Sequence, residues 1–129
     1  MDFDQGLLDL RYYAGTSLLL LRQPDRAATA LHGSLGALPN SHTKAQAVLT
    51  LALADAAIQS NDVDQAVDLA RTALTTARHQ PIMPILQQAR RIRRQAKQLS
   101  PDSVGVGDLD NQLNGFARSL TAIATKAET

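Results

Sequence analysis

Apolar residues recur along this chain at intervals of three and four positions, the spacing of one face of an α-helix. The most regular run consists of Ile82, Ile85, Ala89, Ile92, Ala96 and Leu99. Strict alternation of apolar and polar residues, which is typical of strands, is nearly absent. The pattern therefore predicts an all-α fold.

The periodic segments and the turn residues between them predict six helices. We expect them at about 5–22, from 24 to the turn at 39–41, 42–60, from 63 until the proline at 81, 82–99 and 108–126. Pro24 suits the first position of the second helix. Asn40 or Ser41 is expected to cap the third helix, and Asp62 the fourth. Residues 100–107, with one proline and two glycines, form the expected flexible link.

Two of these helices carry apolar residues in an arrangement that bears on packing. The first is apolar on two sides, with Leu7, Leu10, Ala14, Leu18 and Leu21 on one and Leu8, Tyr12, Gly15 and Leu19 on the other. We therefore expect it to be packed on both sides. The last carries a coiled-coil-like seam of Leu109, Leu113, Phe116, Leu120 and Ile123. That seam either closes the helical stack or pairs with a second copy in a homodimer.

A pattern of small residues occurs twice, which suggests closely crossing helical hairpins. Gly15, Ala27, Leu31, Ser34 and Pro39 recur in weaker form as Ala54, Ala66, Ala70 and Ala73. We expect these residues to lie where the helices of each hairpin pack against each other. The expected units are 8–41, 47–80 and a degenerate third unit with a capping helix at about 82–127, within a single domain spanning 1–129.

Composition narrows the class of protein. The 129 residues are 44% hydrophobic, which is enough for one core without disulfides, and cysteine is absent. No apolar run reaches membrane-spanning length, and the acidic start does not resemble a targeting segment. We therefore expect a cytoplasmic protein without membrane contact. The number of Lys and Arg residues minus the number of Asp and Glu residues is 4 − 8 = −4 over residues 1–70 and 9 − 4 = +5 over residues 71–129. The helices expected late in the chain are therefore basic.

The repeated small residues resemble the tetratricopeptide repeat (TPR), a helical hairpin of about 34 residues. Gly15, Leu18, Ala27, Leu31, Ser34 and Pro39 match it in the first unit, and Leu53, Ala54, Ala57, Ala66, Ala70 and Ala73 match it in the second. The second unit has Arg78 where the repeat closes on proline, and Ala27 and Ala66 are 66 − 27 = 39 residues apart. Segments 22–27 and 64–77 resemble the C-terminal TPR-like region of actinobacterial helix-turn-helix transcriptional regulators. That resemblance implies a regulatory or sensor domain.

The resemblance also implies a binding groove on the first helix of each hairpin. The residues expected to line it are Tyr12, Thr16, Leu19, Val48, Leu51, Asp55, Ile58, Leu86, Arg90, Arg93 and Lys97. Such a wall is apolar at one end and basic at the other, so it suits a helix or extended peptide with an acidic end. The Lys and Asn pattern of carboxylate-clamping TPRs is missing. We therefore expect a non-enzymatic module that binds a protein or peptide.

Other interpretations stay open at this point. Val48, Leu51 and Ile58 could be core residues covered by the last helix, which would make the domain a structural or oligomerisation unit. The cluster Arg90, Arg91, Arg93, Arg94 and Lys97 could hold an acidic peptide or phosphate, or form a solvated face. His32, four residues before Gly36, could accept a phosphoryl group, although the basic residue usual between them is replaced by Leu35.

Residues for other chemistry are missing from the sequence. There is no glycine-rich phosphate loop, nucleophile elbow or paired-carboxylate signature, and the three histidines lack metal-ligand spacing. Stacking aromatics for nucleic acid are also lacking. We expect no catalytic residue, no metal, no cofactor and no direct nucleic-acid binding.

Overall fold

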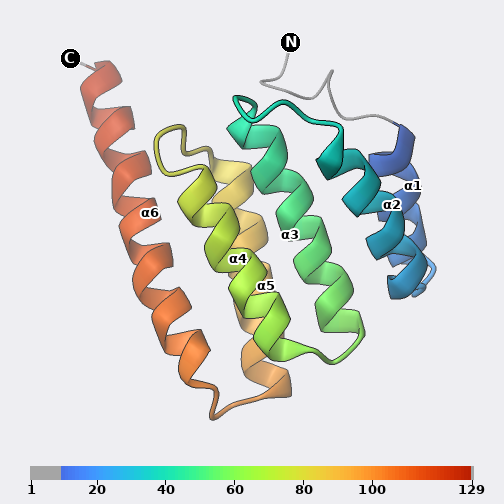
Figure 1. The fold of residues 1–129 in the computed structure, drawn as a ribbon. Helices are drawn as coiled ribbons and strands as arrows, with labels where there is room; N and C mark the ends of the chain where they lie inside the picture. Colours follow the sequence, from blue (N-terminus) through green and yellow to red (C-terminus); the bar gives the residue numbers. More distant parts are fainter. Residues whose placement is uncertain (1–9, 129) are drawn as a thin grey trace.

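The computed structural model describes residues 10–128, which form six helices and no strand. The helices are α1 (Leu10–Leu20), α2 (Pro24–Gly36), α3 (Thr43–Gln59), α4 (Val63–Thr76), α5 (Met83–Leu99) and α6 (Val104–Glu128). They form three antiparallel hairpins, α1–α2, α3–α4 and α5–α6, arranged side by side (Figure 1). The all-α fold with hairpin packing is the one that the sequence predicts.

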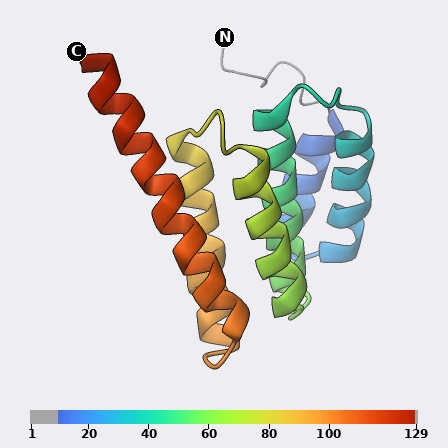
Figure 2. The ribbon, with the colours of Figure 1, turned by 60° about the vertical axis from the view of Figure 1, so that its left-hand side comes forward.

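The first helices of the three hairpins form one layer. Helices α1, α3 and α5 run in the same direction, with α3 packed against both of the others (Figure 1). Helix α6 packs against α4 and α5, and its last turns continue past their ends (Figures 1 and 2). Among the described residues no helix is both long and apolar enough to cross a membrane.

Small residues let the hairpin helices approach closely. A Cβ on Gly15 of α1 would lie 2.6 Å from Cγ of Leu31 in α2, so only glycine fits at that position. In the second hairpin Ala54, Ala66, Ala70 and Ala73 are fully buried, as are Ala27 and Leu31 in the first. Pro39 instead lies exposed in the turn before α3, where its carbonyl oxygen accepts hydrogen bonds from the backbone N–H of His42 and from Nε2 of Gln46.

The turns after α1 and α3 have the same backbone geometry. Arg22 and Asn61 both have a left-handed backbone, with φ of 60° and 59°. Each is followed by a six-to-one hydrogen bond, from Gln23 N to Leu18 O and from Asp62 N to Ala57 O, which defines a Schellman motif. The two turns are 61 − 22 = 39 residues apart, the same interval that separates the small residues of the two hairpins.

The helix starts confirm the expected positions of Pro24 and Asp62 and correct the expected cap of α3. Pro24 lies in the first turn of α2, and the Asp62 side chain accepts a hydrogen bond from Gln65 N at 3.2 Å. The residue that precedes α3 is His42, which makes no side-chain cap bond. The expectation that Asn40 or Ser41 caps this helix is therefore wrong.

The flexible link is shorter than the sequence suggests. Helix α6 begins at Val104, so residues 104–107 are helical and only 100–103 connect α5 to α6. Val106 is 3% exposed and extends the buried stripe of Leu109 and Leu113. A Cβ on Gly105 would lie 3.2 Å from Cγ1 of Val67, so glycine allows α6 to approach α4 here. The free energy gained by burying Val106 in this turn outweighs the helix-propensity cost of the two glycines.

Helix α1 is packed on one side, and the expectation of two packed sides is wrong for its described residues. Gly15 and Leu19 are buried, whereas Leu10 and Leu21 are 84% and 66% exposed. Leu7 and Leu8 lie outside the described residues. The single packed face of α1 is the one that turns toward α2 and α3.

Helix α3 belongs to both apolar cores of the domain. One core joins α3, α4, α5 and α6, and the other joins α1, α2 and α3. Ala47, Leu51 and Ala54 enter the first, while Ala45, Leu49 and Leu53 enter the second. Because α3 is held from both sides, it forms a fixed floor between α1 and α5.

Candidate functional site

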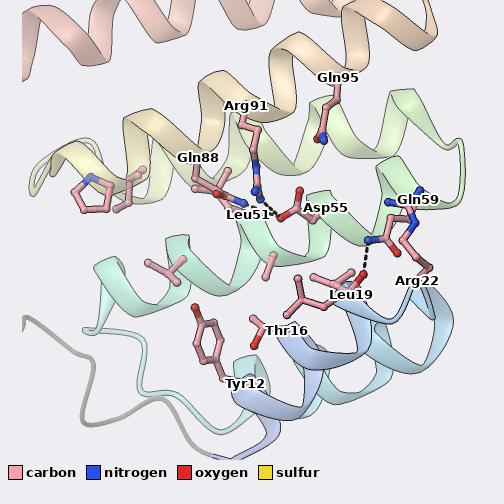
Figure 3. A pocket seen from close by; sticks show the side chains of 15 residues that line it. Tyr12, Thr16, Leu19, Arg22, Leu51, Asp55, Gln59, Gln88, Arg91 and Gln95 are labelled. Atoms are coloured by element: carbon pink, nitrogen blue, oxygen red, sulfur yellow. Dashed lines mark hydrogen bonds and ion pairs between the residues drawn. The ribbon is translucent and has the colours of Figure 1, made fainter.

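A cavity of about 580 Å³ lies between α1, α3 and α5. Helix α3 forms its floor with Val48, Leu51, Asp55 and Gln59. Helix α1 contributes Tyr12, Thr16 and Leu19, and α5 contributes Ile85, Gln88, Arg91 and Gln95. Figure 3 shows Tyr12 and Thr16 of α1, Asp55 of α3 and Arg91 of α5 pointing from the three helices toward the shared space. The volume lies within the range of ligand pockets, roughly 300–1,000 Å³.

An ion pair between the α3 floor and the α5 wall lies at the middle of the cavity. Oδ2 of Asp55 on α3 accepts hydrogen bonds from Nη2 of Arg91 at 2.5 Å and from Nε2 of Gln88 at 2.7 Å, both on α5 (Figure 3). Burial raises the pKa of the Asp55 carboxyl above its ordinary value, against the opposing effects of Arg91 and Gln88. The contact fixes the width of the groove between α3 and α5 at this level.

The end of the cavity toward the helix C-termini is polar. Nε2 of Gln59 donates to the backbone oxygen of Leu19 at 2.8 Å, which ties α3 to α1 (Figure 3). Oε1 of Gln59 and Oε1 of Gln95 are both buried, and no group within the described residues donates to either. Both oxygens are covered by neighbouring protein atoms, so neither is open to a ligand in this conformation.

The opposite end of the cavity is apolar. Val48, Ile85 and Pro84 lie near the starts of α3 and α5, and Tyr12 faces them from α1. Burial, together with neighbouring Tyr13, raises the pKa of the Tyr12 phenol, so the ring stays neutral around neutral pH. The groove therefore changes from apolar to polar along the shared direction of its three helices.

The structure brings together most of the expected groove residues of α1 and α3. Tyr12, Thr16, Leu19, Val48, Leu51 and Asp55 all line the cavity. Ile58 does not, because its half-buried side chain packs against the core shared with α4, α5 and α6. Leu51 serves both roles weighed from the sequence, since it is 1% exposed and also lines the cavity. Among the described side chains of α6, none lines the cavity.

The expected residues of α5 lie on other faces of that helix. Leu86 is buried in the core. Arg93 pairs with Asp110 of α6 through Nε and Nη2, at 2.7 and 3.1 Å. Nζ of Lys97 donates to Pro101 O at 2.8 Å, and Arg90 is exposed beside α6. These four residues do not line the cavity, whose α5 wall lies one or two positions away, at Gln88, Arg91 and Gln95.

The sequence contained a signal for the residues that were missed. Gln88, Arg91 and Gln95 follow the three-and-four spacing of one helix face and flank the apolar stripe of α5. Their polar character suggested a solvated surface rather than a groove wall. No sequence signal pointed to Gln59, because its role depends on a contact with the backbone of α1. The order of residues along the chain does not show which segments lie close together in the fold.

Other candidate groups lie outside this cavity. His32 is exposed on α2, and a Cβ on the nearby Gly36 would meet no atom within 4 Å. Over residues 10–128, no three His, Cys, Asp or Glu side chains come together in a way that could hold a metal ion. Comparison with protein-family models, with curated proteins and with solved structures finds no match to this chain.

Proposed function

We propose that this domain is a non-enzymatic interaction module that binds a peptide or protein segment in the groove between α1, α3 and α5. The observation that carries the proposal is the cavity itself. Three parallel helices supply an apolar end, a central ion pair and the polar residues Gln59 and Gln95 to one space. Pockets with apolar walls and a few fixed polar groups are the usual form of a binding site.

The resemblance to TPR domains supports the same proposal. In that family the first helix of each hairpin lines the binding groove, and here the first helices of all three hairpins line the cavity. As part of the proposal, the module serves as the regulatory or sensor part of a transcriptional regulator like those of actinobacteria, acts in the cytoplasm and does not itself contact nucleic acid.

A groove-filling substitution tests the proposal. Random linear peptides displayed on phage are selected on the wild-type domain, and their affinities are measured by fluorescence polarisation. Thr16→Trp places an indole in the cavity, because Thr16 lines it. We expect this variant to bind the selected peptides at least about tenfold more weakly, the effect of about 1.4 kcal/mol. Equal affinity would place the binding elsewhere and refute the proposal.

Thr29→Trp is the matched control for that substitution. Thr29 is exposed on α2, away from the cavity, and its hydroxyl donates to the carbonyl four residues earlier. The Thr16 hydroxyl makes the same kind of local bond, to Tyr13 O. Both variants therefore lose a comparable contact and gain the same ring, but only one fills the groove.

A second candidate function is self-association through α6. The seam of this helix is buried at Leu109, Leu113 and Phe116, yet continues to Leu120, which is half-buried, and Ile123, which is 51% exposed. An exposed continuation of an apolar stripe suits pairing with a second copy. Sedimentation equilibrium of Ile123→Glu tests this: a dimer that dissociates in the variant supports it, and a monomeric wild type refutes it.

A further inference from the structure

The cavity carries one positive charge that the domain does not balance. Its charged lining residues, among those that the structure describes, are Arg22, Asp55 and Arg91. Asp55 and Arg91 are paired with each other across the groove (Figure 3). Among the described side chains, no Asp or Glu forms an ion pair with Arg22. The guanidinium of Arg22 is therefore the unpaired charge of this site.

Arg22 is anchored at the polar end of the groove, and its side chain is open to a ligand. Its backbone N–H donates to Leu19 O at 3.0 Å, and the same oxygen accepts a hydrogen bond from Nε2 of Gln59. In Figure 3 the Arg22 side chain extends from the turn after α1 toward Gln59 of α3. Arg22 is exposed, so a group that enters the groove can reach its guanidinium.

The backbone of Arg22 makes the presence of this side chain informative. Its φ of 60° lies in the left-handed region, which glycine and asparagine adopt most readily. The equivalent position in the turn after α3 is Asn61, with φ of 59°. A side chain kept in such a conformation at the lining of a cavity points to a role in binding. A guanidinium presents its donors in one plane, which matches the two oxygens of a carboxylate.

Arg22 also supplies the basic end that the sequence suggested for the groove. The residues expected there were Arg90, Arg93 and Lys97, and none of them lines the cavity. The apolar end of the groove begins at Tyr12, roughly 12–15 Å from Arg22 along α1. A ligand that contacts both ends is therefore longer than a single residue.

We propose that Arg22 binds a carboxylate of a protein segment whose apolar side chain fills the opposite end of the groove, near Tyr12 and Val48. This inference rests on the proposed function and specifies the chemistry of its ligand, which combines an acidic group and an apolar group. The carboxylate balances the one unpaired charge of the cavity. It comes from an Asp or Glu side chain or from the C-terminus of the segment, and the experiment separates these two sources.

Peptide selection on two forms of the domain tests the proposal. Two random libraries are displayed on phage, one with the peptide C-terminus fused to the coat protein and one with this terminus free. Each library is selected on the wild type and on Arg22→Gly. We expect the wild type to enrich Asp or Glu in the fused library if an acidic side chain is bound. If the terminal carboxylate is bound, the free library alone should yield binders. Arg22→Gly should lose the enrichment in either case.

Asn61→Gly is the matched control for Arg22→Gly. It makes a change to glycine in the same backbone geometry, and Asn61 does not line the cavity. Glycine adopts both positions without strain, so both variants should be folded, which thermal unfolding checks. Loss of binding in Arg22→Gly alone then reports the missing guanidinium rather than a disturbed turn.

The proposal predicts that Arg22 and the acidic group of a selected peptide are coupled. Replacing that acidic group by its uncharged amide should weaken binding to the wild type about fivefold or more. Arg22→Gly should weaken binding of the acidic peptide by a similar factor. The two changes together should cause no further loss, because both remove the same ion pair. Isothermal titration calorimetry measures the four dissociation constants.

Two results would overturn the inference. If the acidic peptide and its amide bind the wild type within about twofold of each other, the carboxylate makes no net contact. If Arg22→Gly keeps the full affinity for the acidic peptide, Arg22 serves only the end of α1. In both cases loss of binding in Thr16→Trp would still support the groove, so failure of this inference is distinguishable from failure of the proposed function.

Discussion

Gly15 of α1 faces Leu31 of α2 so closely that a Cβ on the glycine would come within 2.6 Å of the leucine Cγ. Leu31 is fully buried in the core of α1, α2 and α3, so a shift of its side chain would disturb its packed neighbours. Gly15→Ala is therefore expected to destabilise the domain by about 1–3 kcal/mol through overpacking, although alanine is the better helix former. Urea unfolding followed by circular dichroism measures the change.

Gly36→Ala is the control for this prediction. Gly36 is the last residue of α2, and a Cβ there would meet no atom within 4 Å. This substitution should stabilise the domain by about 0.5 kcal/mol, because alanine lowers the entropy of the unfolded chain. If both variants changed stability in the same direction, close contact with Leu31 would not be the cause at Gly15.

Asp55→Asn tests the electrostatics at the middle of the groove. Burial raises the pKa of Asp55 above 3.8, so the folded state binds this proton more tightly than the unfolded state. The stabilisation from this group is complete below pH 3.8 and is lost as the pH rises through the folded pKa. The asparagine variant lacks this pH dependence. Its unfolding free energy should therefore increase relative to that of the wild type as the pH rises. Unfolding free energies between about pH 3 and pH 7 measure the difference. A wild type that gains relative to the variant over this range would mean that Arg91 outweighs burial.

Phe116→Ala tests the contribution of α6 to the stack. Phe116 is 5% exposed and belongs to the core shared with α3, α4 and α5. Its truncation should cost about 3–5 kcal/mol, whereas Ile123→Ala, at a 51% exposed position on the same seam, should cost less than about 0.5 kcal/mol. Chemical denaturation measures both. Equal losses at the two sites would show that the outer turns of α6 are covered in solution.

The hairpins and their close contacts could be predicted from the sequence because they depend on local order and on residue size. Gly15, Ala66 and Ala70 are small where helices meet, and that requirement is visible in the chain itself. The start of α6 was missed for a related reason. Glycines at 105 and 107 suggested a link, but Gly105 lies against Val67, a contact that only the folded packing reveals.

The groove was predicted in part for the same physical reason. Its α1 and α3 residues follow from the pattern of small residues, which sets the rotation of each helix. On α5 the stripe of Ala89, Ile92 and Ala96 is buried as expected, but the wall was assigned to the flank that follows the stripe. The cavity lies on the flank that precedes it, at Gln88, Arg91 and Gln95. An error of one residue turns a helix by about 100°, which is enough to exchange a groove residue for a surface residue.

Arg22→Gly tests the turn after α1. Arg22 has φ of 60°, a conformation that costs a side chain with a Cβ about 1–2 kcal/mol relative to the right-handed region. The glycine variant should therefore be more stable by about 0.5–1 kcal/mol after the entropy of glycine is subtracted. Asn61→Gly, in the same geometry at φ of 59°, should gain less because asparagine tolerates this region better. Thermal unfolding of the two variants compares the gains, and a larger gain at Asn61 would contradict the argument.

Charge reversal at single positions of α5 distinguishes a residue that lines the groove from a residue that contacts α6. Arg93 forms two hydrogen bonds to the Asp110 carboxylate, and these bonds raise the pKa of its guanidinium. Arg93→Glu places two carboxylates together and should lower the thermal midpoint, and Asp110→Arg added to that variant should restore much of the loss. Exposed Arg90, a matched control, should tolerate the same reversal with little change in stability.

Neither reversal should alter the affinity of a peptide bound in the groove, because neither residue lines the cavity. Arg91→Glu should weaken that binding, since it sets two carboxylates against each other at Asp55. If Arg90→Glu lowered peptide affinity as much as Arg91→Glu, the ligand would lie along the outer face of α5 and the proposed groove would be wrong.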